Sequence, residues 1–230
     1  MQYRCPLCRT NGVVPDKARG HEVMCLKCRD HFFIPDQTLE ERIKLGIFTA
    51  ARRNDGEVII ALADRGDNLD VQEEETGHTP LHISSYYGKL FAGRELIHRG
   101  ASLEIRASKT VQTPLFYAAR ENNPKIVRWL LENGADANPQ DPDGTTPLHW
   151  AARKGYIDVA RALVEGGADY RIENLNGLRP LQFAVSYHHP ELRDFLISVE
   201  RASKFIASQR TRSNTKSGKL NKFLFGYGKS

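Results

Sequence analysis

The apolar residues in the centre of the chain recur at the spacing of amphipathic helices. In Ile126-Val127-x-x-Leu130-Leu131 and Val159-Ala160-x-x-Leu163-Val164 they return every three or four positions and so line one face of a helix. A Thr-Pro-Leu sequence precedes each segment, and there threonine can cap a helix whose first turn accommodates the proline. The pattern therefore predicts pairs of helices, the first beginning at Thr-Pro-Leu.

This two-helix unit is repeated along the chain. Copies begin near residues 45, 79, 113, 146 and 179, so that successive starts are 33 or 34 residues apart. Nine residues after each start, where the first helix should end, the chain has residue types that tolerate a positive φ, namely Asn54, Gly88, Asn122, Gly155 and His188. Five phased copies of this length predict a solenoid of stacked helix pairs.

The unit is similar to an ankyrin repeat, both in Thr-Pro-Leu-His at 79–82 and 146–149 and in Gly-Ala-Asp at 134–136 and 167–169. The resemblance covers about residues 43–200. It implies a mainly α-helical, ankyrin-type solenoid of about five repeats that presents a concave surface to a protein or peptide partner, as a non-enzymatic scaffold or adaptor. It also implies that His82 and His149 make structural hydrogen bonds between repeats. The hairpin at 109–112 lacks the glycine of the other copies and is expected to form an altered turn.

In this family the seventh and eighth residues after each start face the concave side. Here they include five cations and three tyrosines, and we identify as candidate partner-binding residues Arg52, Arg53, Tyr86, Tyr87, Arg120, Arg153, Lys154 and Tyr187. Arginine and aromatic residues are favoured at interface hot spots. Because cations predominate, an acidic segment is the expected ligand. The alternative for any one of these residues is a solvated helix end without a binding role.

All four cysteines lie in the first 28 residues, as two Cys-x-x-Cys pairs separated by 16 residues: Cys5, Cys8, Cys25 and Cys28. Two such pairs predict a tetrahedral site for one structural Zn²⁺, or another thiophilic ion, and four thiolates leave no open position for catalysis. Residues 1–38 resemble the small four-cysteine zinc-ribbon fingers of bacterial proteins. That resemblance implies a β-hairpin ribbon, and the alternation at 21–24 is compatible with a strand.

The positive charge of the chain is concentrated at its C-terminal end. The formal net charge is +5, but residues 1–40 carry +1, residues 41–200 carry −4 and residues 201–230 carry +8. In the basic tail, 201–230, a helical pattern is expected to continue the stack, followed by a polar segment expected to be disordered and by an aromatic end. An alternative function is therefore a nucleic-acid-associated regulator, with the zinc ribbon and tail contacting phosphates through Arg210, Arg212, Lys216, Lys219 and Lys222. Docking of the tail to a protein, or no specific role, are the other possibilities.

The sequence also argues against several classes of protein. Its longest uncharged apolar run, 58–63, is far shorter than the roughly 20 residues of a membrane-spanning helix, and the N-terminus has no apolar signal core. Neither a Ser/His/Asp set, a phosphate-binding loop nor a zinc-protease motif is present. We therefore expect a cytoplasmic protein that is not an enzyme and has no small-molecule substrate.

Overall fold

The computed structural model describes residues 2–5, 11–13, 21–25, 27, 31–34 and 38–212. This part of the chain is mainly helical, and its helices are α1 (Leu39–Lys44), α2 (Gly46–Arg53), α3 (Gly56–Asp64), α4 (Pro80–Tyr86), α5 (Leu90–His98), α6 (Pro114–Arg120), α7 (Pro124–Glu132), α8 (Pro147–Lys154), α9 (Ile157–Glu165), α10 (Pro180–Ser186) and α11 (Pro190–Arg212). From α2 onward they form five consecutive pairs, one for each predicted copy. The predicted helical repeats are confirmed.

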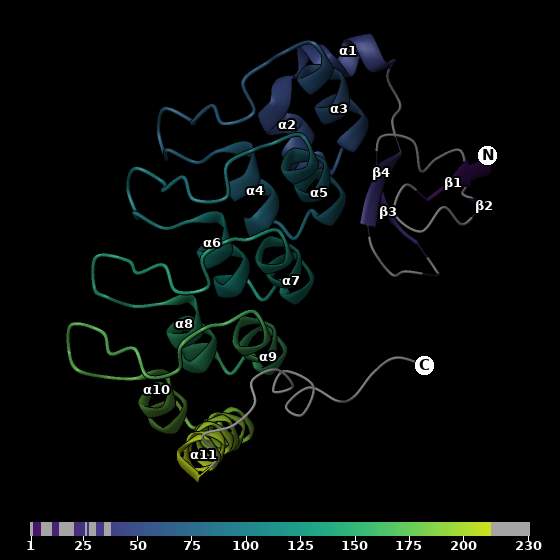
Figure 1. Cartoon of the computed structure of the whole chain (residues 1–230). Helices are drawn as coiled ribbons and strands as arrows, with labels where there is room; N and C mark the ends of the chain where they lie inside the picture. Colours follow the sequence, from purple (N-terminus) through teal and green to yellow (C-terminus); the bar gives the residue numbers. More distant parts are fainter. Residues whose placement is uncertain are drawn as a thin grey trace.

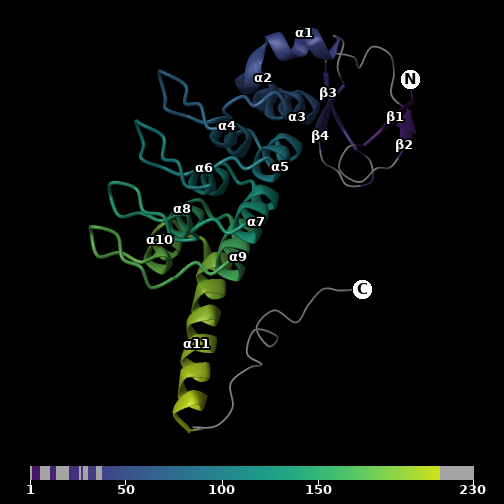
Figure 2. The ribbon, with the colours of Figure 1, turned by 45° about the horizontal axis from the view of Figure 1, so that its top comes forward.

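The five pairs are stacked in one column (Figure 1). The loops that join successive pairs all project to the same side, and the first helices of the pairs lie closer to these loops than the second helices do. Figure 2 shows that α11 projects beyond α10 and the rest of the stack. The helical continuation expected after the repeats is therefore present, and it reaches Arg212.

The expected left-handed residues end the first helices. Asn54, Gly88, Asn122, Gly155 and His188 all have φ between 58° and 74°. The altered hairpin is also visible, because Val111 has φ of 56° where the other loops have Gly77, Gly144 and Gly177. A β-branched residue is strained in this region, so this loop keeps a costly backbone conformation.

Small and branched apolar residues fill the space between neighbouring pairs. The leucine after each helix-starting proline is at most 1% exposed in the three central copies (Leu81, Leu115 and Leu148). Ala119 and Ala152 on the same helices are fully buried, which lets the next helix approach closely. The core therefore runs continuously along the stack, as expected for a solenoid.

The two motif histidines join adjacent repeats. His82 Nδ1 accepts a hydrogen bond from the Thr79 backbone N–H at 3.1 Å, and its Nε2 donates to the carbonyl of Gln112 in the next repeat at 3.0 Å. His149 makes the same bond to the carbonyl of Leu178 at 2.9 Å. The expected structural role of both histidines is confirmed.

Threonine caps the helices less uniformly than the sequence predicts. The Thr79 side chain accepts from the His82 backbone N–H, whereas Thr113 makes no such bond and its buried hydroxyl has no partner in the described part of the chain. Residue 116, the third of that helix, is phenylalanine rather than histidine, so the polar partner that orients Thr79 is missing there. A threonine at this position is thus an incomplete predictor of a cap.

Two antiparallel hairpins precede the helices. Strand β1 (Gln2–Arg4) pairs with β2 (Asn11–Val13), and β3 (His21–Met24) pairs with β4 (His31–Ile34). The strand expected at 21–24 is confirmed. Among the helices described, none has both the length and the apolar character needed to span a membrane.

Candidate protein-binding surface

The ends of the first helices, α2, α4, α6, α8 and α10, lie beside the projecting loops (Figure 1). We call the surface formed by these helix ends and loops the inner face. The candidate partner-binding residues all lie at, or one residue beyond, these ends: Arg52, Arg53, Tyr86, Tyr87, Arg120, Arg153, Lys154 and Tyr187. Because equivalent positions of stacked pairs repeat in register, the fold brings this set to one side of the molecule.

A hollow of about 420 Å³ opens on the inner face between α2, α4, α6 and the two loops that join them. Three tyrosines and three cations contribute to its lining, namely Tyr86, Tyr87, Tyr117, Arg52, Lys109 and Arg120. The described lining residues include one carboxylate, Glu73. The hollow therefore combines aromatic surface with an excess of positive charge.

Tyr117 anchors the floor of the hollow. It is 1% exposed, and its hydroxyl lies 2.8 Å from both His78 Nε2 and Thr110 Oγ1. Burial lowers the pKa of His78, and the opposing effect of Glu73 is countered by Arg120 and Arg52. His78 is therefore neutral near pH 7 and leaves the charge of the hollow to its arginines and lysine.

Arg120 lies against the aromatic wall of the hollow. Its guanidinium carbon is 4.7 Å from the ring centre of Tyr117 and 5.9 Å from that of Tyr86. Arg120 Nε also donates to Glu121 at 3.0 Å. These contacts hold a planar donor group at the surface, and a preoriented guanidinium loses less freedom when it binds a carboxylate.

The same arrangement recurs one repeat further along. The guanidinium carbon of Arg153 lies 5.3 Å from the ring centres of both Trp150 and Tyr187. Tyr187 is in turn parallel to Phe183, with ring centres 6.3 Å apart. Two arginine–aromatic stacks in consecutive repeats therefore extend the hollow into a stripe along the inner face.

The remaining cations of the set differ in their neighbours. Arg52 forms an ion pair with Glu73. Burial tends to raise the pKa of Glu73, but hydrogen bonds from Thr76 and Arg52 outweigh it and hold that pKa below its usual value. Lys109 and Lys154 are exposed and have no ion-pair partner among the described residues. A ligand carboxylate can therefore approach these lysines without displacing an existing ion pair.

The sequence pattern does not identify Tyr117 as part of the site. It lies one residue after the position of the motif histidine, where the other copies have Ile83, Trp150 and Phe183, and this position is normally assigned to packing. The feature of the sequence that could have indicated a role in the site is the hydroxyl group of this residue, since a buried tyrosine usually finds a polar partner near the surface. The partner is His78, 39 residues earlier in the chain.

Two of the four cysteines lie within the described residues. Cys5 follows β1 directly and Cys25 follows β3 directly, and their exposures are 0% and 2%. Cys8 and Cys28 lie outside the described residues. The described residues alone contain no cluster of three potential metal ligands.

The described residues include only two of the five basic residues assigned to the alternative nucleic-acid function. Arg210 and Arg212 belong to the last turns of α11. Lys216, Lys219 and Lys222 lie outside the described residues.

The described repeats match a family model for ankyrin repeats in three copies. The two matched ranges, 47–141 and 115–207, together cover more than half of the chain. Taken together, the two ranges run from α2 to α11. The family match and the five helix pairs therefore concern the same part of the molecule.

Several curated proteins are similar to parts of this region. BRCA1-associated RING domain protein 1 of Caenorhabditis elegans is 37% identical over 65 residues, which are 28% of this chain and 9% of that protein. Ankyrin repeat and SOCS box protein 3 of Bos taurus is 34% identical over 39% of this chain and 17% of its own length. Ankyrin repeat and SOCS box protein 9 of Mus musculus is 29% identical over 46% of this chain and 35% of its own length. This chain therefore spans about a third or less of the length of these relatives.

Proposed function

The chain belongs to the ankyrin-repeat family, and from this premise we propose that it is a non-enzymatic adaptor that binds an acidic segment of a protein partner on its inner face. Ankyrin repeats are interaction modules, and two of the relatives carry a SOCS box by name. We further propose that the adaptor acts in the cytoplasm. The proposal assigns the binding role to the helix ends and loops of the inner face.

The hollow between α2, α4 and α6 carries this proposal. Its lining holds three cations, Arg52, Lys109 and Arg120, and one carboxylate, Glu73, around about 420 Å³ of tyrosine-lined space, and Arg52 is paired with Glu73. An acidic side chain entering this space would meet charged donors beside aromatic surface, where partial exclusion of water strengthens ion pairs. Flanking apolar residues of the ligand could pack on Tyr86 and Tyr87, which are 38% and 53% exposed.

Repetition supports binding of an extended segment rather than of one side chain. The Arg120 and Arg153 stacks occupy equivalent positions of consecutive repeats. A peptide lying along the stack would meet a cation at both of these repeats. Since the guanidinium groups are already held against aromatic rings, little ordering free energy opposes the binding.

A peptide-display experiment tests the proposal with a defined probe. The full chain should select, from a random 12-residue library, sequences rich in Asp and Glu with neighbouring apolar residues. Arg120→Glu combined with Arg153→Glu should weaken the binding of a selected peptide by about 10- to 100-fold, because two favourable charge contacts become repulsive.

The control variant, Arg128→Glu, reverses one charge on the other side of the α6–α7 pair. Arg128 is an exposed residue of the second helix, α7, and lies away from the inner face. This variant should bind the selected peptide like the unmodified chain. Selection of peptides without acidic residues, or equal loss of binding in Arg128→Glu, would contradict the proposal.

We also propose that residues 1–38 bind one structural Zn²⁺ through Cys5, Cys8, Cys25 and Cys28. The supporting observation is the equivalent position of the two cysteine pairs. Arg4 pairs with Asn11 and Met24 pairs with His31, so each Cys-x-x-Cys falls in a six-residue connection that begins directly after the first strand of a hairpin. Four thiolates suit a closed tetrahedral zinc site, and the burial of Cys5 and Cys25 suits a structural one.

Metal analysis tests this second proposal. The purified chain should contain one zinc per molecule, and Cys5→Ser combined with Cys25→Ser should abolish the binding. Removal of zinc by a chelator should increase hydrogen exchange in residues 1–38, since metal binding contributes folding free energy to so small a segment. Exchange in α4–α9 should not change. A metal-free chain with unchanged exchange in residues 1–38 would refute the zinc site.

A further inference from the structure

In the part of the chain that the structure describes, no further repeat follows the last helix pair, and the outer surface of this pair is nevertheless apolar. Six residues after each copy start, the first four copies have Ala51, Ser85, Ala119 and Ala152, all with 0% exposure. The fifth copy has Val185 at this position, and it is 53% exposed. A terminal repeat is expected to present a polar outer surface, so a larger apolar residue here requires an explanation.

We call the outer surface of the last pair the end face, and it contains a hollow of about 290 Å³. Leu181 and Val185 of α10 and Leu196 of α11 supply its apolar lining. Leu175 and Leu178 of the loop before α10 are also exposed, by 78% and 39%, but they do not line the hollow. An exposed apolar residue beside a hollow is typical of a docking site.

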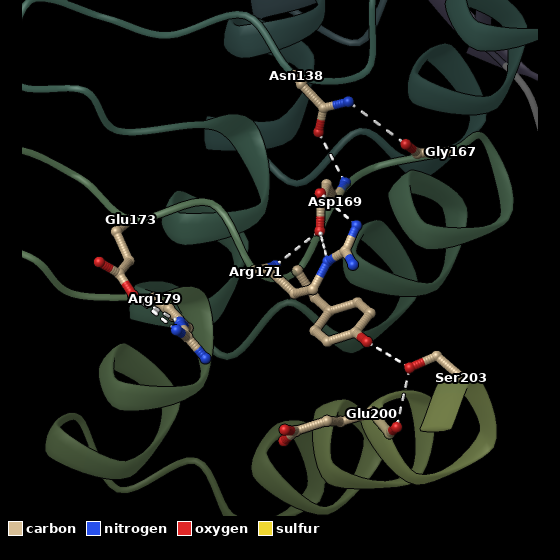
Figure 3. A network of polar contacts seen from close by, with 9 residues as sticks. Asn138, Gly167, Asp169, Arg171, Glu173, Arg179, Glu200 and Ser203 are labelled. Atoms are coloured by element: carbon tan, nitrogen blue, oxygen red, sulfur yellow. Dashed lines mark hydrogen bonds and ion pairs between the residues drawn. The ribbon is translucent and has the colours of Figure 1, made fainter. Parts of the chain in front are cut away.

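Polar residues at the rim of the hollow are already paired with one another (Figure 3). The Tyr170 hydroxyl is hydrogen-bonded to Ser203 Oγ of α11, and Ser203 Oγ in turn donates to the Glu200 carbonyl at 2.9 Å. Arg179 forms an ion pair with Glu173 at 2.7 Å. The rim is thus held in place without a ligand, and the apolar floor is the part left uncovered.

We propose that residues 220–227 of the same chain cover the end face. These residues, Leu-Asn-Lys-Phe-Leu-Phe-Gly-Tyr, lie outside the described part, and five of the eight are large apolar or aromatic residues. The seven residues before them, 213–219, are all polar or glycine. The tail therefore consists of a polar linker followed by a short segment able to bury apolar surface, whose burial contributes roughly 25 cal/mol per Å².

The length of the linker is sufficient. From Arg212 back to Glu200 at the rim, α11 covers 12 residues, or about 18 Å at 1.5 Å per residue. The eight steps from residue 212 to residue 220 can extend to about 26 Å at 3.3 Å per residue. Residue 220 can therefore reach the hollow after the chain turns back at the end of α11.

Connectivity favours this occupant over a separate molecule. A segment joined by a short linker is present at an effective concentration in the millimolar range. It therefore competes well with a second copy of the chain. The inference is independent of what the inner face binds.

Hydrogen exchange in the full-length chain tests the inference. Phe223→Ser combined with Phe225→Ser should increase exchange in residues 174–189 by about fivefold or more, because removal of the covering segment lets α10 and its loop open more often. Exchange in α4–α7 should remain as in the unmodified chain. The control, Lys216→Ser combined with Lys219→Ser, changes the linker but keeps the apolar segment, so it should leave exchange in 174–189 unchanged.

The reciprocal experiment changes a residue of the end face. Val185→Asp adds a charge at a half-exposed position, so the repeat should still fold, and it should increase exchange in residues 220–227. Equal exchange in 174–189 for the Phe variant and the unmodified chain would overturn the proposal. So would a concentration-dependent dimer that Val185→Asp abolishes and the Phe variant does not, since a second copy would then be the occupant.

Discussion

Individual histidines connect the repeats in a way that makes stability depend on pH. Burial lowers the pKa of His82 to about 4, and burial also lowers the pKa of His149. Both rings must stay neutral to accept a hydrogen bond at Nδ1 while donating from Nε2 to a carbonyl of the next repeat. Protonation removes the acceptor and places a charge in the core.

The sign of the pH effect follows from this depressed pKa. The unfolded histidine, with a pKa near 6.5, binds more protons than the folded one between pH 6.5 and about 4, so stability falls as the pH is lowered through this range. His82→Gln should lose less stability than the unmodified chain over the same interval, by up to about 3 kcal/mol. Urea unfolding at pH 7.5, 6.0 and 4.5 measures this difference.

The control for this comparison is His98→Gln. His98 is exposed on α5 and takes no part in the hydrogen bonds of His82, so His98→Gln leaves those bonds in place. If His82→Gln and the unmodified chain lose the same free energy between pH 6.5 and 4.5, His82 does not control the acid sensitivity.

At the scale of single elements, local causes explain what the sequence predicted. The five left-handed residues that end the first helices were identifiable because Asn, Gly and His tolerate this backbone conformation without help from distant parts of the chain. The short helix α1 was not identified. It is held by Arg42, which is 6% exposed and contacts Asp55 at 2.6 Å and Glu57 at 2.8 Å across the start of α3.

The inner hollow illustrates the same limit. Its cations were visible in the sequence from their repeating positions, whereas the pairing of His78 with Tyr117 joins residues of two different repeats. Such a pairing depends on how one helix pair stacks on the next. Periodicity predicts that the pairs stack but does not specify which polar atoms then meet.

The strained loop provides a prediction for one element. Val111→Asn should stabilise the protein by about 1 kcal/mol, because asparagine adopts φ of 56° more readily than a β-branched residue does. Val111 is 39% exposed, so the apolar burial that the substitution loses offsets only part of this gain. Thermal unfolding measures the change. A lower midpoint than that of the unmodified chain would show that the side chain contributes more than its backbone strain costs.

The described helix pairs form a linear stack in which each pair contacts its neighbours. Damage at one end should therefore remain local, because stability is approximately a sum of repeat and nearest-neighbour terms. Asp55→Asn weakens the buried ion pair of Arg42 and should destabilise the first helix pair by about 3 kcal/mol. Hydrogen exchange should rise strongly in residues 39–64 and little in α8 and α9.

A uniform rise of exchange along all five pairs would contradict this prediction and indicate a single cooperative unit. Glu57→Gln is the matched comparison, since Glu57 is 65% exposed and contributes less to holding Arg42. Its effect on the first pair should be clearly smaller.

The two tryptophans of this chain lie on opposite sides of the helix pairs. Trp150 stacks with Arg153 on the inner face, whereas Trp129 of α7 contacts Arg94 on the second helices. Intrinsic fluorescence can therefore distinguish the two sides without any added label. With Trp129→Phe, the emission of Trp150 should change as the peptide binds. With Trp150→Phe, the same titration should leave the emission of Trp129 nearly unchanged.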